Sequence, residues 1–341
     1  MMGTLRFGIV GTGTIAHRFA QAVRNVDGVE LAAVASRNPE TGEAFAAEFG
    51  IPRVFVGYET MAQSDAIDAA YIAVPHSGHM TCTCMMLRGG KHVLCEKPMA
   101  VTAAEGELMF RTAKENGVFL MEAMWARLVP GTLKMLELVR EGVLGDILGV
   151  EGKFCYTMDE DEMDHHVFRP EHGGGALLDV GVYGLHFALW YLGRDVSAAD
   201  VRSALYGGVD AHTCMLLQYA DGAIADLSAA ILLRKPNEGF VYGSKGYAYL
   251  PRFYAPQRIE LHLHGQEVRT IETPYAGNGF EEQIAHVRDC VREGRTESPV
   301  VTPSDTLYVL RQMDAIRKKI GVIYPQDQEE NTTDVVSAFV Q

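Results

Sequence analysis

The first part of the chain alternates short apolar runs with segments of helical periodicity. The apolar runs predict strands over residues 5–10, 29–36, 54–55, 69–74, 92–95 and 119–122. Apolar residues at helical spacing predict helices over residues 15–24, 39–49, 77–88 and 103–116. Strands that are apolar along almost their whole length are typical of a parallel sheet buried on both faces. Residues 1–123 are therefore predicted to form a doubly wound α/β domain, with ligands beyond the carboxyl ends of its strands.

The pattern changes to a period of two from about residue 147. Alternating apolar and polar positions predict strands over residues 147–156, 201–206, 213–219, 223–230, 239–242, 248–250, 259–264 and 268–272. Asp221-Gly222 is a hairpin signal. Helices are expected over residues 132–140, 280–292 and 304–319. Residues 124–341 are therefore predicted to form an α+β domain with an open, mostly antiparallel sheet, whose last helix packs back on the first domain.

A glycine turn joins the first strand to the first helix. Gly11 allows the tight turn, Gly13 lets the backbone approach a pyrophosphate, and Ala16 lets the helix pack closely on the strand. Thr14 and Ile15 open the helix, whose N-terminal N–H groups and positive dipole end suit a phosphate. The context of strand, turn and helix predicts a dinucleotide-binding Rossmann domain.

The end of the second strand bears on the choice between NAD and NADP. An NAD-selective site usually has an acidic residue here for the ribose 2′-hydroxyl, whereas this chain has Ser36 and Arg37. An arginine can hold a 2′-phosphate through several donors and stack on adenine. We therefore expect NADP to be preferred, with NAD as the alternative; the competing interpretation is a surface arginine in a helix-entry loop.

Composition narrows the class of protein. The 341 residues carry 44 acidic and 30 basic side chains, and the net charge of −14 argues against nucleic acid and anionic membranes as partners. No apolar run reaches the roughly 18 residues of a membrane span, and no signal peptide is expected before the first strand. The six cysteines lack metal-pair spacing, so we expect reduced thiols in a cytoplasmic protein without a bound metal.

Two loops that follow predicted strands carry candidate chemistry. We expect Pro75, His76 and His79 to lie in a loop beneath the nicotinamide ribose. A metal site is the alternative, but two histidines without further ligands at a fitting spacing make a poor one. Glu96 and Lys97 follow the next strand, and a lysine there can bind the reacting hydroxyl and lower its pKa. The alternative is an ordinary surface lysine; the Lys97–Pro98 bond is a candidate cis peptide.

A glycine-rich segment in the second half offers acid–base groups. Asp179, Tyr183 and His186 are spaced by four and three residues, which predicts one helix face. A carboxylate, a phenol and an imidazole suit proton transfer, and a nearby ammonium would lower the pKa of the phenol. The alternative is a set of buried polar groups that pair with one another. Trp125 and Arg169 are further substrate candidates, and the acidic loop 159–166 is expected to be a solvated loop.

Together these motifs resemble the glucose–fructose oxidoreductase/inositol dehydrogenase (Gfo/Idh/MocA) family over nearly the whole chain. The resemblance rests on the glycine turn at 11–16, Glu96-Lys97-Pro98 and the GGGALLDVGVYGLH segment at 173–186. The EAMW segment, Tyr183 and the ending IGVIYP at 320–325 are similar to the branch that contains dimeric dihydrodiol dehydrogenase and NADP-dependent D-xylose dehydrogenase.

The resemblance implies a role for each candidate residue. Lys97 would hydrogen-bond the substrate hydroxyl and the nicotinamide ribose, Tyr183 would be the acid/base, and Asp179 would orient the substrate or Lys97. His186 stands where many relatives have Asp, which leaves its role open.

The implied reaction is hydride transfer between a sugar or cyclic diol and the nicotinamide, in a homodimer or higher homo-oligomer. Glycoside 3-oxidation, a bound-cofactor glycosidase or epimerase, and an NADP-responsive regulatory protein remain alternatives. The sequence does not name the substrate, since fold does not settle function.

Overall fold

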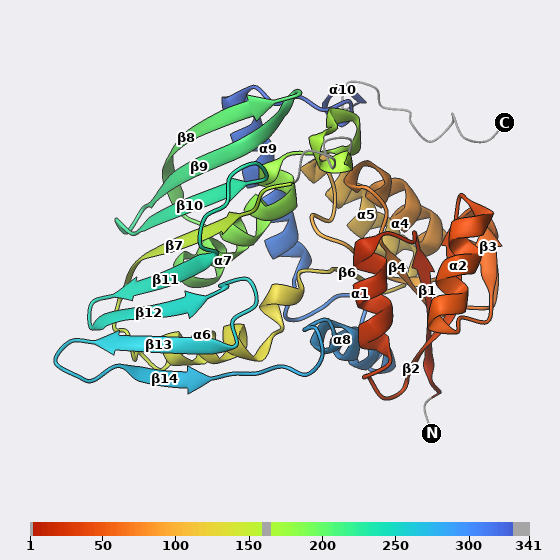
Figure 1. The fold of residues 1–341 in the computed structure, drawn as a ribbon, viewed down its shortest axis with the longest axis horizontal. Coiled ribbons are helices and arrows are strands. Elements are labelled where there is room, and N and C mark those ends of the chain that lie inside the picture. Colours follow the sequence, from red (N-terminus) through yellow and green to blue (C-terminus); the bar gives the residue numbers. More distant parts are fainter. Residues whose placement is uncertain (1–2, 159–164, 330–341) are drawn as a thin grey trace.

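The computed structural model describes residues 3–158 and 165–329. The first sheet has six strands, all parallel, with helices packed against it (Figure 1). The strand order is β3-β2-β1-β4-β5-β6, and every pairing in this sheet is parallel. The strands are β1 (Leu5–Val10), β2 (Val29–Ser36), β3 (Val54–Val56), β4 (Ala69–Ile72), β5 (His92–Cys95) and β6 (Leu120–Glu122). The helices are α1 (Thr14–Val23), α2 (Pro39–Phe49), α3 (Glu59–Ala62), α4 (His79–Arg88) and α5 (Ala103–Asn116).

Apolar side chains on both faces hold this sheet between its helices. All four residues of β4 are buried, as are most of β1 and β5. On one face Phe19 of α1 stacks on Tyr71 of β4, with ring centroids 3.7 Å apart. The predicted parallel Rossmann-type sheet is therefore confirmed.

The second sheet has eight strands in the order β14-β13-β12-β11-β7-β10-β9-β8. Only β7 and β10 pair in parallel, so the predicted mostly antiparallel sheet is also confirmed. Its strands are β7 (Ile147–Cys155), β8 (Val196–Tyr206), β9 (Val209–Tyr219), β10 (Ile224–Ala230), β11 (Glu238–Gly243), β12 (Gly246–Pro251), β13 (Arg258–Leu263) and β14 (Arg269–Glu272).

Helices cover one face of this second sheet and leave the other open (Figure 1). These helices are α6 (Pro130–Arg140), α7 (Val182–Leu192) and α9 (Pro303–Ile320). Burial along the C-terminal half of β9 alternates from residue to residue, as expected of a strand with one covered face. Strand β8 begins earlier than predicted. The sequence pattern missed its first half because those residues are mostly exposed, small or polar and give no apolar alternation.

The last helices return to the first sheet's layer. Helix α8 (Glu281–Arg292) packs on α1, and α9 packs on α5 before the short α10 (Gln326–Glu329). The first sheet ends at Glu122 and the second begins at Ile147, while the division at 123/124 stays a prediction.

The glycine-rich segment departs from a regular α-helix. Residues Leu177–Gly181 form a π-helix that continues into α7, so Asp179 lies in a wider turn than Tyr183 and His186. The prediction of a single face for all three residues is therefore wrong: Asp179 and Tyr183 lie beside Lys97, whereas His186 contacts Glu122.

One described segment has the length and hydropathy of a membrane span, contrary to our expectation. It is Pro170–Leu192, with 23 residues and a mean hydropathy of 1.2 in its most apolar window. The fold buries 83% of that window, because α7 lies between the second sheet and α9. This burial is typical of a core helix.

Candidate active site

A cavity of about 830 Å³ opens at the carboxyl ends of β1, β2, β4 and β5. Every residue that the sequence predicts to bind the cofactor lines it: Gly11, Gly13, Thr14, Ile15, Ser36, Arg37, Pro75, His76, His79, Glu96 and Lys97. The sequence missed further lining residues, among them Thr12, Asn38, Thr41, Tyr58, His165 and His166. The cavity thus runs from the glycine turn past the end of β2 to Lys97.

The glycine turn has the geometry of a phosphate cradle. Gly11 has a φ of +99°, and a Cβ there would lie 2.4 Å from the backbone oxygen of Ala73. Gly13 is the N-cap of α1, has no side-chain cap, and would place a Cβ in open space. The first N–H groups of α1 therefore face the cavity without a side-chain acceptor, which fits the pyrophosphate of a dinucleotide.

The end of β2 forms a second polar corner of the cavity. Ser36 Oγ lies 2.9 Å from Thr41 Oγ1 and accepts a hydrogen bond from the Asn38 backbone N–H at 3.2 Å. Asn38 caps α2 by accepting from the backbone N–H of Glu40 at 2.8 Å. The described lining of this corner holds Arg37 and no carboxylate, so its charge suits a phosphate better than a bare ribose.

An ion pair between the two halves of the chain lies at the other end of the cavity. The Lys97 Nζ donates to Asp179 Oδ1 at 3.1 Å and to the Asp179 backbone oxygen at 2.7 Å. Tyr156, which the sequence did not single out, donates its hydroxyl to Asp179 Oδ2 at 2.6 Å. The Lys97 and Asp179 side chains keep 13% and 23% of their surface exposed, so both remain accessible from the cavity.

The pair keeps its charges despite burial. Burial alone would lower the pKa of Lys97, but the Asp179 carboxylate, followed by Tyr183 and Glu96, raises it overall. Burial likewise opposes ionisation of Asp179, yet the Lys97 ammonium holds the pKa of that carboxyl well below its ordinary value. At neutral pH the site therefore presents an ammonium group fixed by a carboxylate.

The loop that carries Lys97 is anchored from below. Glu96 accepts hydrogen bonds from the Tyr71 hydroxyl and from the Lys97 backbone N–H, the latter at 3.1 Å. Burial raises the pKa of Glu96, and the nearby Lys97 partly offsets this. The Lys97–Pro98 peptide bond is cis, as the sequence suggested.

Tyr183 lies beside this pair in an aromatic cluster. Its ring centroid is 5.2 Å from Lys97 Nζ, and its hydroxyl accepts a hydrogen bond from Trp125 Nε1 at 2.9 Å. Burial raises the pKa of Tyr183 to about 12, although Lys97 acts to lower it. The expectation of a lowered phenol pKa is therefore wrong, because the side chain is only 5% exposed and desolvation outweighs the ammonium.

Four histidines surround the site, and the sequence assigned a place to only two. His76 Nδ1 donates to the Gly173 backbone oxygen at 2.8 Å, and His79 lies between the backbone oxygens of Pro98 and Val74, each 2.9 Å from a ring nitrogen. Burial lowers the pKa of His76 to about 3 and of His79 to about 4.

His165 and His166 line the cavity, and they were hidden in the acidic loop 159–166, whose residues 159–164 lie outside the described residues. Among the residues that the structure does describe, no group of three or more His, Cys, Asp or Glu side chains could hold a metal ion.

The remaining substrate candidates do not line the cavity. The His186 imidazole lies 3.3 Å from Glu122 Oε2, and both side chains are almost completely buried. Glu122 also accepts from the Met99 backbone N–H at 3.0 Å and from Thr306 Oγ1 at 2.8 Å. Trp125 is buried behind Tyr183, and Arg169 lies in the loop before the glycine-rich segment. These positions support a structural role for His186.

The arrangement places the Lys97–Asp179 ion pair at one end of the cavity, with Tyr183 beside Lys97 but outside the described lining. The glycine turn and the corner at Ser36 and Arg37 offer donors to phosphates, and the Lys97 ammonium offers donors to an oxygen close to the ribose end. Tyr183 keeps a hydroxyl hydrogen at neutral pH beside that ammonium. These groups suit the binding of an oxygen atom and the donation of a proton to it next to a redox cofactor.

Comparison with known proteins places the chain in a family. Residues 5–124 match the Gfo/Idh/MocA model described as "Oxidoreductase family, NAD-binding Rossmann fold", and residues 132–249 match the Gfo/Idh/MocA C-terminal domain. Trans-1,2-dihydrobenzene-1,2-diol dehydrogenase of Mus musculus is 34% identical, with 95% of this chain and 99% of the relative covered.

Two solved structures share the architecture. An aldose-aldose oxidoreductase from Caulobacter crescentus has a TM-score of 0.84 at 28% identity, with 92% of this chain and 97% of that chain covered. A 3-ketoreductase from Actinomadura kijaniata, solved with NADP, has a TM-score of 0.83 at 28% identity, with 93% and 98% covered. The chain therefore belongs to the Gfo/Idh/MocA family of NAD(P)-dependent oxidoreductases.

Proposed function

We propose that this enzyme interconverts a hydroxyl and a carbonyl on a sugar or cyclic diol, with NADP as the preferred cofactor and Lys97 at the reacting oxygen. The observation that carries the proposal is the Lys97–Asp179 ion pair, which lines the same cavity as the glycine turn and lies beside Tyr183. An ammonium group held this way is a preorganised donor for an oxygen that gains negative charge.

Each residue of the centre then has a distinct task. The bound nicotinamide supplies the chemistry of accepting or donating a hydride. Lys97 donates a hydrogen bond to the substrate oxygen, and Asp179 fixes the direction of that ammonium. Tyr183 is protonated at neutral pH, so in the reductive direction it donates its proton to the carbonyl oxygen. In the oxidative direction it must first lose that proton to solvent, and the phenolate then takes the proton of the substrate hydroxyl. The Trp125 N–H, which donates to the Tyr183 oxygen, would stabilise the phenolate in between.

The relatives and the aromatic cluster support the proposed substrate class. The named relatives act on a cyclic diol, an aldose or a 3-keto group, which share a carbon that is either hydroxyl or carbonyl. Phe154 and Tyr254 stack at 3.9 Å beside Tyr183 and are only partly buried. Aromatic faces of this kind suit the apolar face of a ring that carries hydroxyl groups on its edge.

The corner at the end of β2 supports the preference for NADP. Ser36, Arg37 and Thr41 provide hydroxyl and guanidinium donors where a ribose 2′-phosphate would lie. The 3-ketoreductase with the same architecture was solved with NADP. A 2′-phosphate gains charge-assisted hydrogen bonds in such a corner, whereas a 2′-hydroxyl gains only neutral ones.

The open face of the second sheet supports a homodimer. Leu216 and Ile224 are 48% and 45% exposed on neighbouring strands. Phe240 of β11 and Tyr249 of β12 are half-buried, and their ring centroids are 5.0 Å apart. Exposed apolar side chains on the uncovered face of a sheet are typical of a protein–protein interface. Light scattering of the purified chain should give twice the mass of one chain.

A substrate panel tests the proposed function. The purified enzyme is offered NADP+ and NAD+ with aldoses, inositols, glycosides and cyclic diols, and absorbance at 340 nm is followed. Turnover with one class, faster with NADP+, is expected. Silence across the panel with tight cofactor binding would overturn the proposal, in favour of a bound-cofactor epimerase or glycosidase or a regulatory protein.

A further inference from the structure

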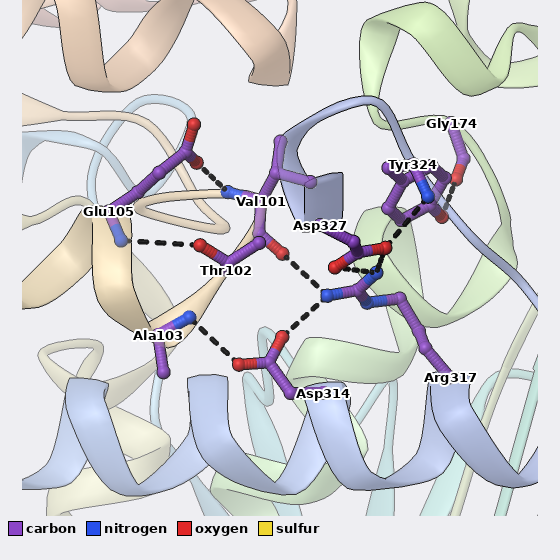
Figure 2. A network of polar contacts seen from close by, with 9 residues as sticks. All are labelled: Val101, Thr102, Ala103, Glu105, Gly174, Asp314, Arg317, Tyr324 and Asp327. Atoms are coloured by element: carbon purple, nitrogen blue, oxygen red, sulfur yellow. Dashed lines mark hydrogen bonds and ion pairs between the residues drawn. The ribbon is translucent and has the colours of Figure 1, made fainter. Parts of the chain in front are cut away.

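A buried arginine in the last long helix joins two loops that carry the catalytic candidates. Arg317 belongs to α9, and its side chain is only 3% exposed (Figure 2). It contacts the segment that follows Lys97 on one side and the segment after α9 on the other. An arginine buried to this degree is held by its partners, since leaving one unpaired is costly.

The first set of contacts reaches the loop after Lys97. Arg317 Nη2 donates to Asp314 Oδ1 at 2.6 Å and to the Val101 backbone oxygen at 3.4 Å. Asp314 Oδ2 accepts from the Ala103 backbone N–H at 2.9 Å, at the first residue of α5 (Figure 2). Helix α9 therefore bonds to the loop that carries Lys97 at two points: the Val101 backbone oxygen and the Ala103 backbone N–H, where the loop enters α5.

The second set of contacts reaches the glycine-rich segment. Arg317 Nη1 donates to both carboxylate oxygens of Asp327, at 2.9 and 2.7 Å, and Asp327 Oδ2 accepts from the Tyr324 backbone N–H at 2.7 Å. The Arg317 guanidinium also lies 4.8 Å from the Tyr324 ring centroid. The Tyr324 hydroxyl donates to the Gly174 backbone oxygen, so the network ends in the segment that leads to Asp179 (Figure 2).

The two loops also touch each other directly. A Cβ on Gly173 would lie 2.8 Å from Val101 Cγ2, so the loops pack without spare room. Their far ends carry Lys97 and Asp179, which meet at 3.1 Å. A small relative shift of the loops would therefore lengthen the Lys97–Asp179 contact.

We propose that Arg317 and Tyr324 are positioning residues that hold the loop of Lys97 against the segment of Asp179, and so set the direction of the Lys97 ammonium. This inference rests on the proposed function, because it assigns a purpose to the alignment of Lys97. Misplacing a catalytic group by about 1 Å costs on the order of a hundredfold in rate. The network thus contributes to turnover without touching substrate or cofactor.

Tyr324→Phe tests the network gently, because it removes one hydroxyl and keeps the ring beside Arg317. We expect kcat to fall about tenfold with KM and NADP affinity within about twofold, since binding groups are untouched. Hydrogen exchange of the backbone amides in 99–103 and 173–179 should become faster. The matched control is Tyr308→Phe. It likewise removes a tyrosine hydroxyl that donates to a backbone oxygen, but Tyr308 lies in α9 and its partner is the Arg194 oxygen, away from the cavity.

The two readouts separate this proposal from the proposed function. Arg317→Lys should lower kcat further than Tyr324→Phe, because a lysine cannot reproduce the forked contacts to two carboxylates. The proposal would be overturned if hydrogen exchange in residues 99–103 or in residues 173–179 of Tyr324→Phe were unchanged, or if its kcat equalled that of Tyr308→Phe. Exchange needs no substrate, so failure of the substrate panel would overturn the proposed function while the exchange result still judges the network.

Discussion

Two pairs of a carboxylate and a basic side chain join the first sheet to the segment 177–192, and they differ in exposure and in their remaining hydrogen-bonding capacity. Lys97 follows β5 and pairs with Asp179, whereas Glu122 ends β6 and lies beside His186. The first pair keeps 13% and 23% of its side-chain surface exposed and lines the cavity. The second pair keeps 2% and 1% for His186 and Glu122, and no part of it lines the cavity.

Remaining hydrogen-bonding capacity distinguishes a pair that can bind substrate from a pair that only holds the fold together. Both carboxylate oxygens of Glu122 already have partners inside the protein: Oε1 accepts from the Met99 backbone N–H, and Oε2 accepts from Thr306 Oγ1 and contacts His186. The Lys97 ammonium has three hydrogens and two acceptors, both on Asp179, which leaves one donor for a ligand. Both pairs consist of a carboxylate and a basic side chain, but only the Lys97–Asp179 pair, through Lys97, has a hydrogen left to donate to a substrate.

Replacing Lys97 should produce the largest effect on activity. Lys97→Met keeps the length of the side chain and removes the charge, so we expect kcat to fall by roughly a thousandfold, the scale of a lost charge-stabilising or proton-handling group. NADP binding should remain, because the residues proposed to hold the phosphates, at the glycine turn and the end of β2, lie elsewhere in the cavity. Turnover is measured by absorbance at 340 nm and cofactor binding by fluorescence titration. Near-normal turnover of the variant would show that the Lys97–Asp179 pair is no more reactive than the Glu122–His186 pair.

Replacing Glu122 should affect stability instead. Glu122→Gln weakens the buried contact with His186 and the hydrogen bonds from Met99 and Thr306, and we expect the free energy of unfolding to fall by about 2 kcal/mol, the scale of disrupted buried hydrogen bonds. The activity of the molecules that stay folded should change less than about twofold. Urea unfolding provides the measurement, and Glu107→Gln, which breaks the exposed pair with Arg311, is the control, with an expected loss below about 1 kcal/mol. An inactive but stable Glu122→Gln enzyme would contradict this role.

The buried histidines at the cavity should make stability depend on pH. Burial lowers the pKa of His76 to about 3 and of His79 to about 4, from an ordinary 6.5, so the unfolded chain takes up these protons first. Their contribution is complete above pH 6.5 and is lost as the pH falls toward the folded values, by roughly 2 kcal/mol per histidine between about pH 7 and pH 5. The lowered pKa values of Asp179 and Glu122 act below this window.

Unfolding by urea at both pH values measures that loss in the wild type and in His79→Gln. The variant should lose less stability on acidification, by about the share of one histidine. Equal losses in the two proteins would show that His79 does not carry the pH dependence.

The corner at the end of β2 should produce the smallest effect, confined to one cofactor. Arg37→Leu removes the guanidinium, so NADP affinity should fall about tenfold while NAD affinity stays within about twofold. Equal weakening of both cofactors, measured by fluorescence titration, would indicate a general role of Arg37 in the fold and would remove the argument for NADP.

The sequence predicts well what depends on neighbouring residues. The glycine turn at Gly11 and Gly13 and the loop at Lys97 follow apolar strands directly, so their place at one sheet edge follows from parallel topology. The cis bond at Lys97–Pro98 was likewise a local expectation.

Features that depend on distant contacts escaped prediction. Asp179 and His186 read as one helix face, but the π-turn at 177–181 and the partner Glu122 separate them. The pKa of Tyr183 follows from burial, which spacing does not reveal. The contact of Arg317 with Val101 joins residues more than half the chain apart, and an arginine in a helix carries no local sign of its burial.

Transfer of a deuterium label from substrate to cofactor shows whether the enzyme moves a hydride and whether Lys97 is needed for that step. A substrate found in the panel is prepared with deuterium on the carbon that bears the reacting hydroxyl, and the reduced cofactor is analysed by mass spectrometry for the wild type and Lys97→Met. We expect deuterium in NADPH formed by the wild type, and label transfer slowed roughly a thousandfold in the variant. Unlabelled NADPH, product without NADPH, or equal rates in the two proteins would contradict the account.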